Sequence, residues 1–295
     1  MAENAKHLFC FGLGYSAQAL IAALRQNQPG QWRFSGTSRM ADRIYPDIAM
    51  QAFDGSGPLP QPGLLQSADH VLISIPPNAG PPDKAGDPVL RQCAGLLARQ
   101  DGLQWIGYLS TTGVYGDRQG EWVDEQAAIT PSHDRGQRRA DAEAGWLDLW
   151  RQHGLPVHLF RLTGIYGPGR NALVSLRQGK AHRAVKPGQV FSRIHVADVA
   201  AVLAASMARP DPGAAYNLAD DEPAPPQDVV AYAAGLLGIE PPPEMPLEQA
   251  GLSPMALSFY SENKRVANDR IKRDLGVALR YPNYREGLAA LLRDL

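Results

Sequence analysis

The sequence contains little cysteine, no long apolar run and no excess of charge of one sign. Its 295 residues include two cysteines, Cys10 and Cys93, and neither belongs to a CxxC pair or to a Cys/His spacing typical of zinc ligands. The scarcity of cysteine indicates a reducing compartment, and we expect both thiols to be buried in the core. We expect no metal site.

Charge and hydropathy exclude further classes. The 29 basic and 30 acidic residues give a net charge of -1, which provides no general attraction to nucleic acid or to anionic membranes. The apolar run near the N-terminus is too short for a signal peptide, and no later run approaches the length of a membrane span. We therefore expect a cytoplasmic protein without a nucleic-acid or membrane partner, whose anionic ligands are bound by local groups.

Short apolar runs alternate along the chain with longer helical patterns. The runs lie at 7–11, 32–37, 70–75, 105–110 and 157–162. Strands separated by helical patterns of 10 to 15 residues are typical of βαβ units, which build a parallel sheet covered by helices on both faces. The pattern predicts a doubly wound α/β fold of the Rossmann type.

Proline clusters near the C-terminus mark a change of organisation, at 221–226 and 241–246. We expect a smaller C-terminal domain that caps the substrate site. The predicted boundaries assign 1–164 and 190–220 to a dinucleotide-binding Rossmann domain, and 165–189 and 221–295 to the capping domain.

The segment GLGYSA directly follows the first apolar run and opens the first helical pattern. It has the spacing GxGxxA through Gly12, Gly14 and Ala17, which permits a tight turn and brings a pyrophosphate onto free N–H groups of a helix N-terminus. Tyr15 and Ser16 belong to the same turn and complete its predicted binding set. The alternative is a glycine-bearing turn with no ligand, but its place in the first unit favours dinucleotide binding.

The second run ends in GTSRM, where an NAD site usually offers an acid to the ribose 2′-hydroxyl. Ser38 and Arg39 instead suit a 2′-phosphate, so we expect NADP, with NAD as the alternative cofactor. A solvated arginine is the competing explanation. Asp54 could accept from the adenine amino group, although an Asp-Gly turn explains it equally well. Ser74, at the end of the third run, completes the predicted cofactor set.

Later motifs occur in a recognisable order: STTGVYG at 110–116, GIYGPGR at 164–170 and SENKRVANDRIKRDLG at 261–276. With these motifs the chain resembles the extended short-chain dehydrogenases/reductases, also called the NAD-dependent epimerase/dehydratase family. The resemblance implies a nicotinamide cofactor, a small-molecule substrate and a homodimer. It also implies that Thr111 holds the reacting hydroxyl of the substrate.

The family's catalytic YxxxK motif is missing at its expected place. Counted from VYG, the tyrosine position falls on Arg135 and the lysine position on Arg139, and the chain has no tyrosine within 116–165 and no lysine within 85–179. A guanidinium stays protonated, so Arg135 cannot act as a general base. It can bind an anionic group or stabilise a developing alkoxide, while Arg139 can donate to ribose hydroxyls. The usual proton relay is therefore absent from this segment.

Alternatives remain for the charged stretch TPSHDRGQRRADAE at 130–143. Its charged residues could form a solvated helix face that pairs with neighbours at small net energy; these are Asp134, Arg138, Asp141 and Glu143. His133 is a conceivable proton donor. Tyr115 is a candidate catalytic acid, and Tyr166 is a second one, with packing as the alternative role for both.

The substrate is only partly defined. Phe191 stands where sugar-nucleotide enzymes of the family often carry a diphosphate-binding arginine; Arg193 lies nearby, and whether it substitutes for that arginine is open. The basic run 177–186 could bind a phosphorylated or carboxylated substrate or face solvent. We expect an NADP-binding oxidoreductase or epimerase-like enzyme acting on a small anionic substrate. The alternative is a non-catalytic NADP sensor or scaffold; nucleic-acid binding has only the basic run in its favour.

Overall fold

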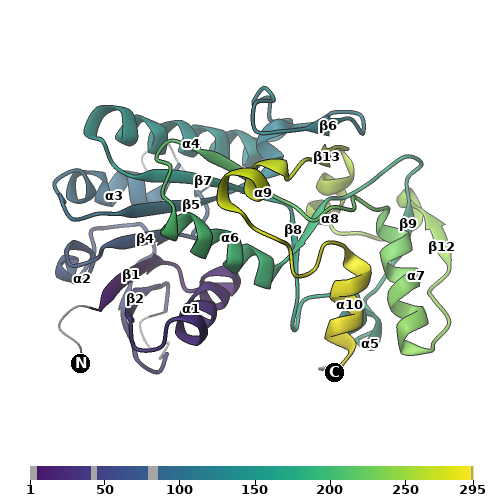
Figure 1. Cartoon of the computed structure of the whole chain (residues 1–295). Helices are drawn as coiled ribbons and strands as arrows, with labels where there is room; N and C mark the ends of the chain where they lie inside the picture. The colour runs from purple at the N-terminus through teal and green to yellow at the C-terminus, as the bar shows by residue number, and fades with distance from the viewer. Residues whose placement is uncertain (1–4, 41–44, 79–85, 294) are drawn as a thin grey trace.

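Figure 1 shows the computed structural model, which describes residues 5–40, 45–78, 86–293 and 295. The main sheet contains β1 (Lys6–Phe11), β2 (Trp32–Ser38), β3 (Ile48–Ala52), β4 (His70–Ile73), β5 (Trp105–Thr111), β7 (Val157–Leu162) and β11 (Ala215–Leu218). The helices are α1 (Tyr15–Asn27), α2 (Pro62–Gln66), α3 (Pro88–Leu97), α4 (Asp134–His153), α5 (Ala172–Arg177), α6 (Val196–Ala208), α7 (Pro226–Leu237), α8 (Pro254–Tyr260), α9 (Asp269–Leu275) and α10 (Tyr284–Leu292).

Shorter elements complete the described chain. Two 3-10 turns are η1 (Thr112–Tyr115) and η2 (Leu247–Gln249). Short strands form the parallel pairs β6 (Trp122–Val123) with β13 (Arg265–Val266), β8 (Gly164–Tyr166) with β10 (Arg193–His195), and β9 (Arg183–Val185) with β12 (Glu244–Pro246).

The main sheet confirms the predicted fold class. Its strand order is β11-β7-β5-β4-β1-β2-β3, and every neighbouring pair is parallel. All five predicted apolar runs are strands of this sheet. The chain first builds outward from β1 through β2 to β3 and then crosses to β4 on the other side. This reversal places a crevice at the carboxyl ends of β1 and β4, where doubly wound proteins bind ligands.

Alternation along β1 divides the core between two faces. Leu8 and Cys10 pack with α1 and α6 on one side, whereas Phe9 and Phe11 pack with α3 and α4 on the other. Successive strand residues point to opposite faces, so a strand that is apolar throughout requires cover on both. Cys93 joins the second core, and both thiols are buried and free, as predicted.

A smaller cluster forms the capping part, at the right of Figure 1. Helices α5, α7 and α10 share a separate buried core that includes Leu173, Ala233 and Leu288. Helix α9 behaves differently, because Ile271 and Leu275 pack into the larger core beside α6. The division of the chain into two domains stays a prediction, with α9 lying against the larger core rather than within the capping cluster.

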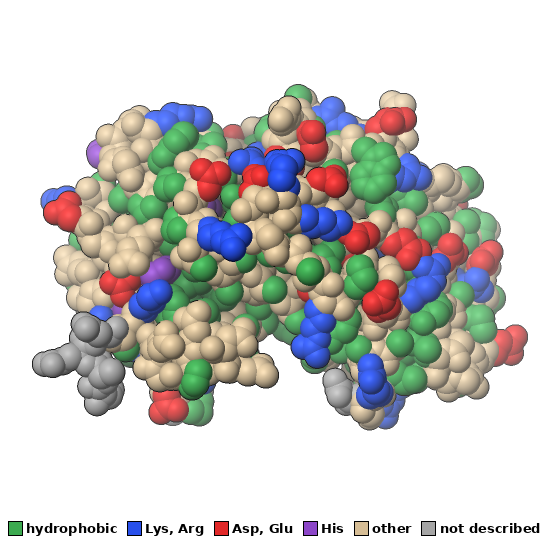
Figure 2. Space-filling model, in the orientation of Figure 1, with side chains coloured by type: hydrophobic (Ala, Val, Ile, Leu, Met, Phe, Trp, Pro, Cys, Tyr) green, Lys and Arg blue, Asp and Glu red, His purple; other side chains and the backbone are tan. Residues whose placement is uncertain are grey.

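Acidic and basic side chains are interspersed on the face shown in Figure 2, in keeping with the balanced composition. None of the helices within the described ranges is both long and apolar enough to span a bilayer.

Candidate functional site

A cleft of about 880 Å³ joins the carboxyl edge of the main sheet to the capping elements. Seven of the predicted site residues line it: Gly14, Tyr15, Ser16, Ser74, Thr111, Arg135 and Arg139. The predicted residues outside its lining are Gly12, Ala17, Ser38, Arg39, Asp54 and Tyr115. The structure therefore brings together the turn, the end of β5 and the start of α4, which are far apart in sequence.

The two glycines of the first turn have different roles. Gly12 has φ +83°, and a Cβ there would lie 2.5 Å from Ile75, so the backbone itself requires glycine. Gly14 has φ -85° and caps α1, and a Cβ there would meet no atom of the described residues within 4 Å. Within that part of the chain, no contact requires glycine at position 14. The open space above it, at a helix N-terminus without a side-chain cap, fits a pyrophosphate.

The crevice between β1 and β4 is held by polar contacts. The Ser74 hydroxyl donates to the Gly12 carbonyl at 2.6 Å, and the Gly12 N–H donates to Thr37 Oγ1 at 2.9 Å. Tyr15 donates its hydroxyl to the Pro168 carbonyl at 2.9 Å, which links the first turn to the GIYGPGR loop. These contacts position the turn before any ligand binds.

The residues predicted to select the cofactor lie at the end of β2. Ser38 accepts from the Met40 N–H at 3.2 Å, and Arg39 is exposed. Asp54 accepts from the N–H and hydroxyl of Ser56, at 2.8 and 2.7 Å. That geometry matches the turn that we gave as the alternative for Asp54.

Thr111 ends β5 and caps the short turn η1, and its Oγ1 accepts from the Gly113 N–H at 3.2 Å. The hydroxyl hydrogen of Thr111 is not used by this contact, so it can be donated to a substrate oxygen in the cleft.

The two arginines that we predicted at the YxxxK positions both line the cleft. Arg135 lies in the first turn of α4, and its guanidinium lies over the ring of Phe259 in α8, 4.6 Å from the centroid. Arg139, one turn later, donates Nη1 to the Leu109 carbonyl at 2.6 Å and to the Tyr108 hydroxyl at 3.1 Å. Arg138 does not line the cleft. Arg135 and Arg139 therefore border the cleft, and their functional roles stay predictions.

Tyr115 is a correction to the predicted catalytic set. Its side chain is fully buried, donates to Asn217 Oδ1 at 2.7 Å and accepts from Arg161 Nη1 at 2.9 Å. Burial raises the pKa of Tyr115 to about 12. Because the phenol lies in the core and not at the cleft, it cannot reach a substrate there.

Glu143 is a second correction, since it does not belong to a surface face. Its carboxylate is 4% exposed, accepts from Ser110 Oγ at 2.5 Å and pairs with Arg161 Nη2 at 2.8 Å. Arg161 continues to Tyr115, so one buried network lies beneath the end of β5. This network supports Ser110, the neighbour of Thr111.

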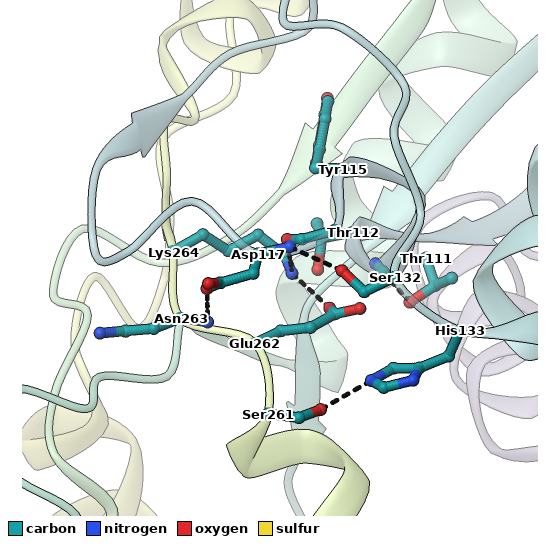
Figure 3. Close-up of polar contacts among 12 residues, drawn as sticks. Thr111, Thr112, Tyr115, Asp117, Ser132, His133, Ser261, Glu262, Asn263 and Lys264 are labelled. Atoms are coloured by element: carbon teal, nitrogen blue, oxygen red, sulfur yellow. Dashed lines mark hydrogen bonds and ion pairs between the residues drawn. The ribbon is translucent and has the colours of Figure 1, made fainter.

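Residues from the motif SENKRV enter the cleft, and sequence reasoning assigned them no role. Lys264 donates Nζ to the Gly116 carbonyl at 2.7 Å and to Glu262 Oε2 at 2.6 Å. The Ser261 hydroxyl lies 2.6 Å from Nε2 of His133. Figure 3 shows these groups drawn together with Thr111. The signal available in the sequence was the motif itself, which carries a lysine and an acid two residues apart.

The capping wall contains Phe191, which lines the cleft and packs edge to face with Tyr260 at 5.2 Å between centroids. Arg193 also lines the cleft, but its Nη1 donates to the carbonyls of Phe191 and Ala224 at 2.7 and 3.0 Å. Arg193 thus braces the backbone beneath Phe191.

Basic side chains dominate the charge of the cleft. Among the described residues that line it, six are basic, namely Arg135, Arg139, Arg170, Lys180, Arg193 and Lys264, and one is acidic, Glu262. That acid is paired with Lys264. Within the described ranges no three His, Cys, Asp or Glu side chains are grouped as a metal would require.

No protein-family model matches the chain. A solved structure of a functionally unknown conserved protein from Silicibacter pomeroyi is 50% identical, covers 98% of this chain and 99% of that one, and has a TM-score of 0.86. The Escherichia coli protein YeeZ is 29% identical over 259 residues, which are 85% of this chain and 83% of YeeZ.

The NAD complex of dTDP-glucose 4,6-dehydratase from Bacillus anthracis is 14% identical, covers 98% of this chain and 96% of that one, and has a TM-score of 0.79. Further structures with this fold also carry names of epimerases and dehydratases. The chain therefore belongs to the same family as the Silicibacter pomeroyi protein, and its fold is that of the NAD-dependent epimerases and dehydratases of the extended short-chain dehydrogenase/reductase type.

Proposed function

We propose that this protein is an NADP(H)-dependent oxidoreductase or epimerase-like enzyme that acts on a small anionic substrate. The observation that carries the proposal is a single cleft that contains the Gly14 turn, Thr111 and Arg135 and has six basic side chains against one paired acid. A cleft with this charge attracts anions, and its partly enclosed walls strengthen the attraction.

The cofactor would lie along the first turn and the end of β2. The N-terminus of α1, with its open space above Gly14, would hold the pyrophosphate, while Ser38 and Arg39 would bind the 2′-phosphate of NADP. Arg139 would donate to the nicotinamide ribose from a guanidinium already held by Leu109. The structural relative from Bacillus anthracis was solved with NAD, which supports a nicotinamide dinucleotide of some kind.

A bound nicotinamide supplies or accepts the hydride, and the protein's own groups manage charge and protons. In a carbonyl reduction the Thr111 hydroxyl would hold the substrate oxygen, and Arg135 would stabilise the negative charge that develops on it. The proton cannot come from Arg135 or Tyr115. We favour Lys264 as the proton donor. Its ammonium has three N–H groups, and the described residues provide acceptors for two of them, so the third can face a substrate.

A non-catalytic NADP sensor or scaffold is the second candidate, since the family's tyrosine and lysine are replaced. The cleft of about 880 Å³ beside the proposed cofactor site favours the enzyme, because a sensor needs no room for a substrate. A cytoplasmic location and a homodimer remain predictions from sequence and resemblance.

The test is a titration of the protein with NADPH and NADH, followed by a screen of anionic carbonyl compounds for oxidation of the reduced cofactor. Binding and turnover would support the enzyme. Binding without turnover of any compound, together with closure of the cleft in a crystal of the complex, would support the sensor. Absence of dinucleotide binding would contradict both.

A further inference from the structure

Besides Tyr15 of the first turn, five aromatic rings line the cleft among the described residues, which is more than an all-polar ligand requires. They come from β8, from the segment before β10, and from α8 and α10: Tyr166, Phe191, Phe259, Tyr260 and Tyr284. Aliphatic side chains fill the space between them on the capping side, and these include Val190, Val229 and Leu288. The capping half of the cleft therefore has an apolar wall, in which Tyr166 and Tyr284 are buried while Phe191, Phe259 and Tyr260 keep ring surface exposed to a ligand.

The pair of Phe191 and Tyr260 is the best-defined part of this pocket. Their rings meet edge to face, with an interplanar angle of 76°, and both are half-buried. Phe191 is fixed by two backbone hydrogen bonds with Ala224, of 3.0 and 3.1 Å, and by Arg193 on its carbonyl. Lys186 donates to the carbonyl of Tyr260 at 2.5 Å. Because both backbones are held, the wall is formed before a ligand arrives.

Cationic groups occupy the edge of the same cleft. Arg170 and Lys180 line it and are exposed, so their charged ends remain hydrated beside the half-buried rings. Arg135 is exposed as well, and stacking on Phe259 uses one face of its guanidinium and leaves its N–H edge for a carboxylate. An apolar interior with a basic edge matches a molecule that is apolar along its body and anionic at one end.

A sugar nucleotide fits this arrangement less well. Arg170 and Lys180 offer donors to a diphosphate only at the exposed edge; one held among the rings would need N–H donors there, and Arg193 already uses Nη1 on two carbonyls. A diphosphate left without donors beside apolar walls would lose its hydration without compensation.

We infer that the capping half of the cleft binds an organic acid with a flat aromatic body and a single carboxylate, and that Phe191 and Tyr260 select this class against sugar nucleotides. The inference rests on the proposed function, which supplies the reaction. It adds the chemical class of the substrate and names the residues that determine specificity.

Calorimetry with four probes tests the inference, on the protein with and without saturating NADP⁺. The probes are cinnamate, its methyl ester, acetate and UDP-glucose. We expect cinnamate to bind at least about tenfold more tightly than each of the other three, since only it joins a ring to a carboxylate. Phe191→Ala should lower the affinity for cinnamate about tenfold. Trp122 is an exposed aromatic residue outside the cleft lining, so Trp122→Ala should leave that affinity unchanged.

Thermal unfolding of Phe191→Ala checks that the variant is folded, and Tyr260→Leu provides a second variant if it is not. Phe191→Arg should weaken the binding of cinnamate and strengthen the binding of UDP-glucose. Tighter binding of UDP-glucose than of cinnamate by the parent protein, or no binding of cinnamate while NADP⁺ still binds, would overturn the inference. If NADP⁺ does not bind, the proposed function fails, and the cofactor-free titrations still decide whether the pocket prefers an aromatic acid.

Discussion

The guanidinium of Arg135 lies over the ring of Phe259, 4.6 Å from its centroid. Arg135 lies in the first turn of α4, next to the main sheet, and Phe259 belongs to α8, so this contact joins the two walls of the cleft. A second contact joins the start of α4 to the end of α8, where Nε2 of His133 lies 2.6 Å from Oγ of Ser261. The start of α4 therefore forms part of the cleft wall together with α8.

Replacing Arg135 tests this assignment directly. We expect Arg135→Ala to reduce turnover or anion affinity about a hundredfold, because removal of a donor that stabilises developing charge costs ~3 kcal/mol. Arg138→Ala is the matched control on the next turn and lies outside the cleft lining, so it should cost well under about 1 kcal/mol. Steady-state kinetics or calorimetry with cinnamate measures both, and equal effects of the two substitutions would refute the role of Arg135.

The two glycines of the first turn should respond differently to substitution. Gly14→Val should abolish dinucleotide binding and leave thermal unfolding nearly unchanged, because a side chain at position 14 meets ligand space and no protein atom. Gly12→Val should instead destabilise the fold, since position 12 combines φ +83° with a contact of 2.5 Å. Fluorescence titration and thermal melts separate the two effects. Loss of folding in Gly14→Val would show that the glycine is structural.

Cofactor preference follows from the end of β2. One charge-assisted contact from Arg39 to a 2′-phosphate should make NADPH bind roughly tenfold or more tightly than NADH. Arg39→Asp should remove or reverse that preference, while Arg99→Asp, an exposed arginine after α3, should leave it unaltered. Intrinsic fluorescence with each cofactor is the measurement. Equal affinities in the parent protein would exclude the assignment to NADP.

The buried pair of Glu143 and Arg161 should matter for stability. Glu143→Ala leaves the Arg161 charge unpaired in the core, so we expect the free energy of unfolding to fall by about 3–5 kcal/mol. Asp148→Ala breaks an exposed pair with Arg151 in the same helix and should cost less than about 1 kcal/mol. Urea denaturation gives both values. A small effect at Glu143 would mean that water or a rearranged partner compensates the arginine.

The buried carboxyl of Asp220 should make the stability of the protein depend on pH. Its side chain is 1% exposed, and burial raises its pKa from 3.8 to about 8 although Arg193 acts in the opposite direction. Between these two values the folded state holds a proton that the unfolded state has lost. The free energy of unfolding should therefore fall as pH rises from about 4 to about 8, by at most ~1.4 kcal/mol per unit from this group.

Asp220→Asn should remove this slope, because the amide stays neutral in both states. Thermal or urea unfolding of the parent and the variant across the same pH range tests the prediction. Parallel pH profiles for the two proteins would show that Asp220 is ionised in the folded state.

The sequence predicted most of the main sheet and its flanking helices, because the patterns that indicate strands and helices are local. Each apolar run, such as 105–110 or 157–162, is long enough to be a strand, and the helical patterns between them force parallel pairing. Parallel strands end at one edge, so Gly14 and Thr111 could be placed in one site from their positions after strands. Counting from STTGVYG also identified Arg135 and Arg139 as cleft residues, since one helix fixes their spacing.

Side-chain direction and contacts between distant segments were decided only by the tertiary structure. Tyr115 lies four residues after Thr111, yet η1 turns it into the core, where it contacts Asn217 rather than the cleft. Glu143 and Asp141 look alike in sequence, but α4 buries only Glu143, against Arg161. The sequence pattern of one segment does not specify which distant residues a helix face will contact.

The sequence by itself determined the doubly wound sheet, because the apolar runs and the helical patterns between them are local signals; it also predicted that Arg135 and Arg139 lie near the carboxyl edge, where the structure has them lining the cleft. Only the tertiary structure brought Lys264 to Gly116 across 148 residues and placed Phe259 over Arg135. These contacts depend on how the capping segment packs against the sheet, and that packing is the sum of many weak, long-range interactions rather than a property of any local stretch.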